Sequence, residues 1–140
     1  MPFDVKHDCQ EPLGFLIFHK EMGLTLFATD CFYLKYKFSS LNQIMLECNY
    51  SDEIIEKNLA KGLTHDIVMR RTAKSHMSLA TCKKTLLAND LRNVSNILLI
   101  HLSDTNSDSR LFKSEIQGVT GKIVHIAEKG LEIDFNKEII

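Results

Sequence analysis

The sequence predicts an α/β domain in which helices flank a mixed sheet. Two observations carry this prediction. The first third is rich in short alternating apolar segments, which favour strands. The second half alternates apolar strands with one-sided helical patterns, which favours layered packing of helices on a sheet.

The first half of the chain begins with a predicted strand over residues 3–6. A hairpin follows, formed by FLIFHK at 15–20 and TLFATD at 25–30, and then a short apolar strand at 43–48. A helix is predicted over 51–60, with Ser51 as its N-cap and Gly62 just beyond its end.

In the second half, residues 78–89 place apolar side chains at helical spacing behind a capping serine, Ser78. The continuous apolar segment NILLI at 96–100 is typical of a strand buried on both faces, and it stops at a polar loop. A helix over 108–117 and two strands, KIVHIA at 122–127 and LEIDF at 131–135, complete the prediction.

Length and composition indicate one domain, residues 1–140, with a real core. The net charge of −1 gives no global basic surface of the kind that non-specific nucleic-acid binding requires. The four cysteines are far apart and predict free thiols. No apolar stretch is long enough for a membrane span and the N-terminus does not resemble a signal peptide, so the sequence predicts a cytoplasmic protein with no membrane partner.

Three polar residues share one context, because each follows a predicted strand and begins a polar loop. They are His7, Asp30 and His101. If these strands lie in one sheet and run the same way, the three side chains converge at one edge. Imidazole and carboxylate are ligands that zinc and manganese accept. The alternative is that each is an ordinary polar residue at the end of a strand.

Five short motifs occur in an order that resembles the metallo-β-lactamase superfamily, and most closely its YycJ-type subgroup. The resemblance covers roughly residues 3–135. The motifs are HDxxEPxGF at 7–15, ATD at 28–30, ECNYSD at 47–52, SHMS at 75–78 and IHLSDTNSD at 100–108. The fold that this resemblance implies is part of a four-layer αββα sandwich.

The resemblance also implies roles for four residues. His7 and His101 match metal-binding histidines, and Asp30 matches the carboxylate that bridges two divalent metals in a complete member. His76 matches a histidine suited to protonating a leaving oxygen or binding a phosphate. Its alternative is an exposed histidine at a helix N-terminus. The implied metal is zinc, with manganese as the second choice.

The sequence departs from the subgroup at several points. Tyr50 stands where the subgroup has a histidine, which leaves Glu47 and Asn49 alone from that motif. Glu47 then either supports the site or simply forms hydrogen bonds within the core. The HxHxDH motif, which supplies most ligands of the first metal, is not found in the 140 residues. The chain therefore resembles the C-terminal half of such a domain.

Two functions follow as expectations. The first is a metal-dependent hydrolase of the phosphodiesterase or nuclease class, in which a metal-activated hydroxide attacks and the isolated chain is weakly active or inactive. Its substrate would be a nucleic acid or another phosphodiester. The second is a non-catalytic half-domain that binds a partner or oligomerises. Its partner would be the missing N-terminal half or a second copy of the chain, because half of a sandwich exposes an apolar sheet face.

Overall fold

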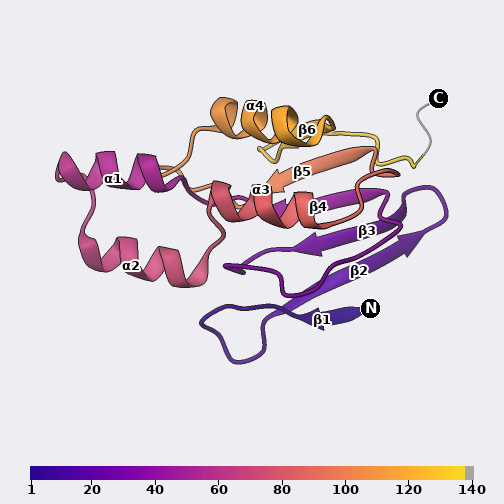
Figure 1. Ribbon diagram of the computed structural model, residues 1–140, viewed down its shortest axis with the longest axis horizontal. Helices are drawn as coiled ribbons and strands as arrows, with labels where there is room; N and C mark the ends of the chain where they lie inside the picture. Colours follow the sequence, from indigo (N-terminus) through magenta and orange to yellow (C-terminus); the bar gives the residue numbers. More distant parts are fainter. Residues whose placement is uncertain (138–140) are drawn as a thin grey trace.

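A computed structural model of the protein describes residues 1–137. Its centre is one six-stranded mixed sheet whose strands lie side by side in chain order (Figure 1). The strands are β1 (Pro2–Asp4), β2 (Leu13–His19), β3 (Gly23–Ala28), β4 (Gln43–Glu47), β5 (Asn96–Ile100) and β6 (Ile123–Ile126).

All strands except β2 point in the same direction. β2 is antiparallel to both of its neighbours, whereas β3, β4, β5 and β6 pair in parallel. Five carboxyl ends therefore meet at one edge of the sheet, which is the arrangement that the sequence analysis required for convergence of the strand-end residues.

The four helices are α1 (Asp52–Ala60), α2 (Asp66–Ser75), α3 (Leu79–Ala88) and α4 (Ser109–Thr120). Figure 1 shows α3 and α4 along one face of the sheet, and α1 and α2 beyond the carboxyl ends of the strands. The predicted caps are present in part. Ser78 caps α3 by accepting a hydrogen bond from the Thr81 N–H, whereas Ser51 precedes α1 without a side-chain capping bond.

The hydrophobic core lies between the sheet and helices α3 and α4. One row of paired residues across four strands is almost fully buried, and it joins Leu26, Ile44, Ile97 and Val124. These side chains belong to one cluster with Cys82 and Leu86 of α3 and Phe112 and Ile116 of α4. All four cysteines are free thiols, as the sequence predicts, and three of them are buried.

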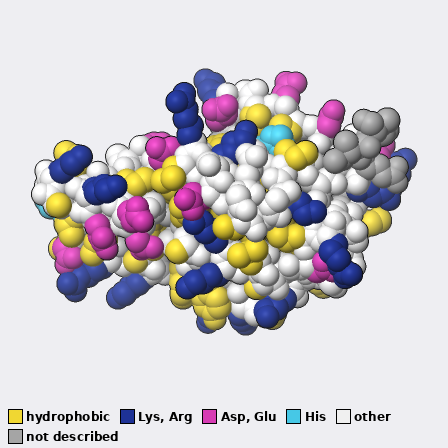
Figure 2. Space-filling model, turned by 45° about the horizontal axis from the view of Figure 1, so that its top comes forward, with side chains coloured by type: hydrophobic (Ala, Val, Ile, Leu, Met, Phe, Trp, Pro, Cys, Tyr) yellow, Lys and Arg dark blue, Asp and Glu magenta, His cyan; other side chains and the backbone are white. Residues whose placement is uncertain are grey.

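The opposite face of the sheet carries alternate side chains of the same strands. On β2 this face presents Leu13, Phe15 and Ile17, with exposed fractions of 45%, 39% and 43%. Acidic and basic side chains are interspersed over the molecular surface that Figure 2 shows. Within residues 1–137 no helix combines the length and the apolar content needed to cross a bilayer.

Two predictions about secondary structure are wrong. Residues 131–135 do not form a strand, because the segment runs back to the amino ends of the strands and bonds there at its end. The Asn136 carbonyl accepts from Gln43 Nε2, and the Lys137 N–H donates to Glu21. The sequence analysis also missed α2, whose only buried residue is Ser75.

Candidate metal centre

The carboxyl edge of the sheet brings His7, Asp30 and His101 together. His7 follows β1, Asp30 follows β3 and His101 follows β5. Asp30 Oδ1 lies 4.0 Å from His7 Nε2 and 3.7 Å from His101 Nδ1. The convergence expected from the strand ends is therefore present in the fold, and the role of the three as metal ligands remains a prediction.

The hydrogen bond of His7 fixes the state of its ring. Nδ1 lies 2.8 Å from the backbone carbonyl of Ser75, the last residue of α2. A carbonyl only accepts, so Nδ1 carries the proton. Nε2 lies 3.1 Å from Asp8 Oδ1, and because both atoms are acceptors in an unprotonated pair, the contact is favourable when Nε2 carries a proton or when a cation lies between the two atoms. A backbone carbonyl behind a histidine is a common support for a metal-binding imidazole.

Glu47 is the fully buried carboxylate behind the site. Its Oε1 lies 2.7 Å from His76 Nδ1 and 2.9 Å from His101 Nδ1. Its Oε2 accepts the N–H of Cys31 at 2.8 Å. An ionised Glu47 thus accepts a hydrogen bond from the Nδ1–H of each neutral ring, which leaves both Nε2 atoms unprotonated.

The electrostatics of Glu47 are set first by its burial. Burial raises the pKa of Glu47 to about 7, against the Cys31 N–H and the positive charge of His101, which lower it. Burial also lowers the pKa of His76, so the neutral form of this ring is favoured. A divalent cation at this edge would shift the balance toward ionised Glu47, because a nearby positive charge favours the carboxylate.

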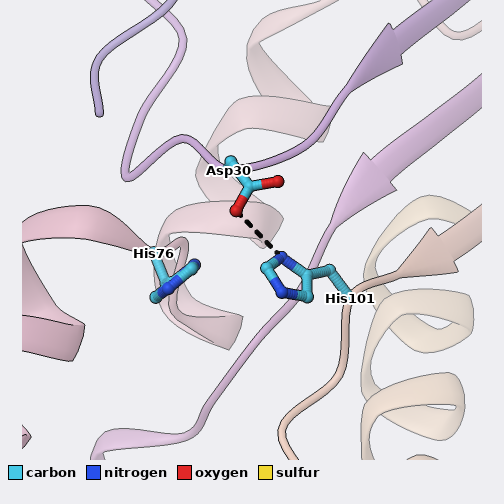
Figure 3. Close-up of side chains that lie close together, drawn as sticks. All are labelled: Asp30, His76 and His101. Carbon is cyan, nitrogen blue, oxygen red and sulfur yellow. Dashed lines mark ion pairs between the residues drawn. The ribbon is translucent and has the colours of Figure 1, made fainter. Parts of the chain in front are cut away.

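His76 lies closer to the centre than the sequence resemblance implies. One ligand atom from each of Asp30, His76 and His101 lies within 4.8 Å of the others, and Figure 3 shows the three side chains grouped at the edge. The ring of His76 is 4.9 Å from that of His101 and 5.5 Å from that of His7, centroid to centroid. The geometry thus allows His76 either as a ligand or as a group that acts on the substrate.

Backbone strain marks two of these residues. Asp30 has φ of 48° and His101 has φ of 57°, both in the left-handed region that non-glycine residues seldom occupy. Such conformations persist where the surrounding structure holds them, and they cluster at functional sites. At both positions the left-handed turn directly follows a strand and aims the side chain across the sheet edge.

Asn49 forms hydrogen bonds to the loops that carry His76 and His101. Its Nδ2 donates to the His101 carbonyl at 2.7 Å, and its backbone N–H donates to the Met77 carbonyl at 2.9 Å. The sequence analysis left the roles of Glu47 and Asn49 open because their motif is incomplete. The signal that identifies them is position, since both lie at the carboxyl end of β4 between the loops of Asp30 and His101.

The donor set fits a divalent cation. It combines three imidazoles with a half-exposed carboxylate, a mixture that zinc and manganese accept. The separation of no more than 4.8 Å applies to ligand atoms of Asp30, His76 and His101, and it is of the order that zinc bonds of about 2.0–2.2 Å require.

Comparisons with known proteins bear on the fold. No protein-family model and no curated protein matches the sequence. Among solved structures, the chain is similar to the metallo-β-lactamase fold protein YhfI from Bacillus subtilis, with a TM-score of 0.65 and 16% sequence identity. The match covers 93% of this chain and 46% of YhfI, so the chain spans about half the length of that protein. At this identity the likeness shows the fold alone, and the chain therefore has the metallo-β-lactamase fold over the part that the two structures share.

Proposed function

We propose that this chain carries the metal-binding edge of a divalent-cation-dependent hydrolase that cleaves phosphodiester bonds. The observation that carries the proposal is the meeting of three imidazoles and Asp30 at the carboxyl edge of the sheet, with the buried Glu47 behind them. Zinc is the leading cation and manganese the alternative. The order of the five sequence motifs supports assignment to the YycJ-type subgroup.

Asp30, His101 and His7 would hold the metal. Asp30 is the only carboxylate of the three, and as a bridge it would serve two cations, which need an anion between them at a separation of about 3.5–4 Å. A bound divalent cation supplies a Lewis acid and lowers the pKa of water so that a nucleophile forms near neutral pH.

His76 would act on the substrate. Its Nδ1 is engaged by Glu47 at 2.7 Å, so Nε2 is the atom left to hold or deliver a proton. Glu47 stabilises the charged ring while the proton is held, and the low pKa that burial gives His76 favours its release to a leaving oxygen. If His76 is instead a ligand, it replaces His7 beside Asp30 and His101.

Matched alanine variants separate these roles. His7→Ala and His76→Ala would be compared with His19→Ala, an exposed histidine on β2, for bound zinc by elemental analysis and for cleavage of bis-p-nitrophenyl phosphate. We expect His7→Ala to lose zinc and His76→Ala to keep it. Loss of zinc in His76→Ala alone would reverse the two roles, and zinc content unaffected by either would contradict a metal centre built on these histidines.

We also propose that the isolated chain binds metal weakly and turns over slowly. The proposal is supported by the chain's span of about half of YhfI and by the lack of an HxHxDH motif in its 140 residues. A complementing segment added in trans should then raise both zinc content and turnover. Full occupancy by two zinc ions with robust turnover in the chain alone would contradict this.

A second candidate function is that of an oligomerising module without catalysis. It is favoured by the apolar face of β2, where Leu13, Phe15 and Ile17 are partly exposed next to one another. We assign a second copy of the chain to this face, because a two-fold dimer pairs one apolar patch with itself. Sedimentation at high micromolar concentration tests it: a dimer that Phe15→Lys dissociates is expected, and a clean monomer would contradict it.

A further inference from the structure

A cavity of about 710 Å³ lies at the opposite end of the sheet from the histidines. It is lined by residues that immediately precede the parallel strands, among them Asn42 before β4, Ser95 before β5 and Lys122 before β6. These are the amino ends of the same strands whose carboxyl ends carry the candidate metal centre (Figure 1). The cavity and the metal centre are therefore separate sites.

The charge of the lining is positive. Arg92, Lys122 and Lys137 line the cavity, and the lining contains no carboxylate. Within residues 1–137 neither lysine forms a salt bridge, and only Arg92 has a carboxylate partner, Asp90, at 2.7 Å. Among residues 1–137, the three cations of the lining and this one neighbouring carboxylate leave a surplus of two positive charges at the cavity.

The side chain of Lys122 reaches across the cavity to a backbone carbonyl. It is half-buried, and its Nζ donates to the Arg92 carbonyl at 3.3 Å. A lysine just after a helix usually serves the carbonyls at that helix end. Lys122 follows α4, but its Nζ reaches the loop before β5. Its ammonium therefore lies between the start of β6 and that loop.

The backbone of Lys137 forms hydrogen bonds through both its N–H and its carbonyl. Its N–H donates to the Glu21 carbonyl at 2.9 Å, and its carbonyl accepts from Ser95 Oγ at 3.2 Å. The rim of the cavity is thus built from segments far apart in the sequence and tied by hydrogen bonds. Ile123, which is half exposed, adds an apolar surface beside the cations.

From these observations we propose that the cavity binds a small phosphate-bearing molecule of nucleotide size. The surplus charge and the fixed ammonium of Lys122 recognise the phosphate, because a lysine binds phosphate as a point charge. Ile123 contacts the apolar or aromatic part of the ligand. The volume lies within the range of about 300–1,000 Å³ that small-molecule sites occupy.

The test is calorimetric titration of the chain with adenosine 5′-monophosphate, inorganic phosphate and adenosine. EDTA is present throughout, so that phosphate cannot be held by a metal at the other end of the sheet. We expect the nucleotide to bind in the micromolar to millimolar range, phosphate more weakly and adenosine not detectably. Raising the salt concentration should weaken nucleotide binding.

Three variants locate the binding. Lys122→Gln/Lys137→Gln should weaken nucleotide binding by about tenfold, as the loss of two ion pairs predicts, while Lys84→Gln, an exposed lysine on α3, should not change it. Asp90→Asn should strengthen binding about twofold to threefold, because it releases Arg92. Binding that is unchanged in the double lysine variant, or absent in the native chain, would overturn the proposal.

Discussion

The two ends of the sheet are built from the same strands but hold opposite kinds of chemistry. At the carboxyl end, imidazoles and carboxylates point inward and are held by hydrogen bonds, as in the contact of Glu47 with His76 at 2.7 Å. At the amino end, Lys122 donates to a backbone carbonyl, and within residues 1–137 neither Lys122 nor Lys137 has a carboxylate partner. Parallel strands gather loops at both ends, and the residue types in those loops decide whether a cation or an anion is attracted.

The prediction with the largest expected effect concerns the zinc affinity of the carboxyl end. Asp30→Ala should lower the zinc affinity of the chain about a hundredfold or more, because it removes the carboxylate between His7 and His101. Lys137→Gln, at the other end, should leave zinc affinity unchanged. Competition with a chromophoric chelator measures both. Equal affinities in the two variants would mean that zinc does not bind at the carboxyl edge.

The second prediction concerns stability and pH in the metal-free protein. Burial raises the pKa of Glu47 to about 7 in the folded state, above its ordinary value of 4.5. The folded state therefore binds more protons than the unfolded state between these values, so this contribution to stability is complete below pH 4.5 and is lost as the pH rises toward 7. Glu47→Gln, which carries no charge, should lack this loss of stability with rising pH.

Urea unfolding in EDTA at pH 5 and pH 8 measures this effect. Relative to the native chain, Glu47→Gln should gain about 1–3 kcal/mol of unfolding free energy when the pH is raised from 5 to 8. The low pKa of His76 makes a contribution of the opposite sign to the pH dependence. A difference independent of pH would show that Glu47 titrates at its ordinary value.

Much of the fold could be predicted because its core elements carry strong periodic signals. The strand at 96–100 and the helix begun by Ser78 agree with β5 and α3 to within one residue. Residues 131–135 alternate like a strand, but tertiary bonds at Asn136 carry the segment back to the amino ends of the strands. An alternating pattern indicates that the two sides of an extended segment face different environments. It does not show that the segment pairs with a neighbouring strand.

The candidate site was predictable to the extent that sheet direction could be guessed. His7, Asp30 and His101 each end a strand, and once the strands run the same way their convergence follows. The position of Glu47 between two histidines could not be inferred, because its motif has Tyr50 in place of a histidine. The nearness of His76 depends on the path of α2, which the sequence analysis did not predict.

The third prediction tests how far the carboxyl edge depends on Asn49. Asn49→Ala leaves the His101 carbonyl without its part-buried 2.7 Å donor, which should cost about 0.5–1.5 kcal/mol of unfolding free energy. Zinc affinity should fall by up to about tenfold, because the His101 loop is less well held. Asn89→Ala is the matched control, since Asn89 Nδ2 donates to the Thr85 carbonyl at 2.7 Å in a part-buried position at the end of α3. An effect no larger than that of the control would remove Asn49 from the supports of the site.

The smallest expected effect is at the amino end, where the Arg92 side chain is 86% exposed and pairs with Asp90. The Arg92 guanidinium lowers the pKa of Asp90 to about 2, so any stabilisation is present above the ordinary pKa of 3.8 and is lost as the pH falls toward 2. Solvent screens an exposed pair, and Arg92→Ala should therefore leave the unfolding free energy at pH 7 close to that of the native chain. The backbone carbonyl that accepts from Lys122 is kept in the variant. A clear loss of stability in urea unfolding would mean that the cations of this end stabilise the fold, and that their arrangement needs no ligand to explain it.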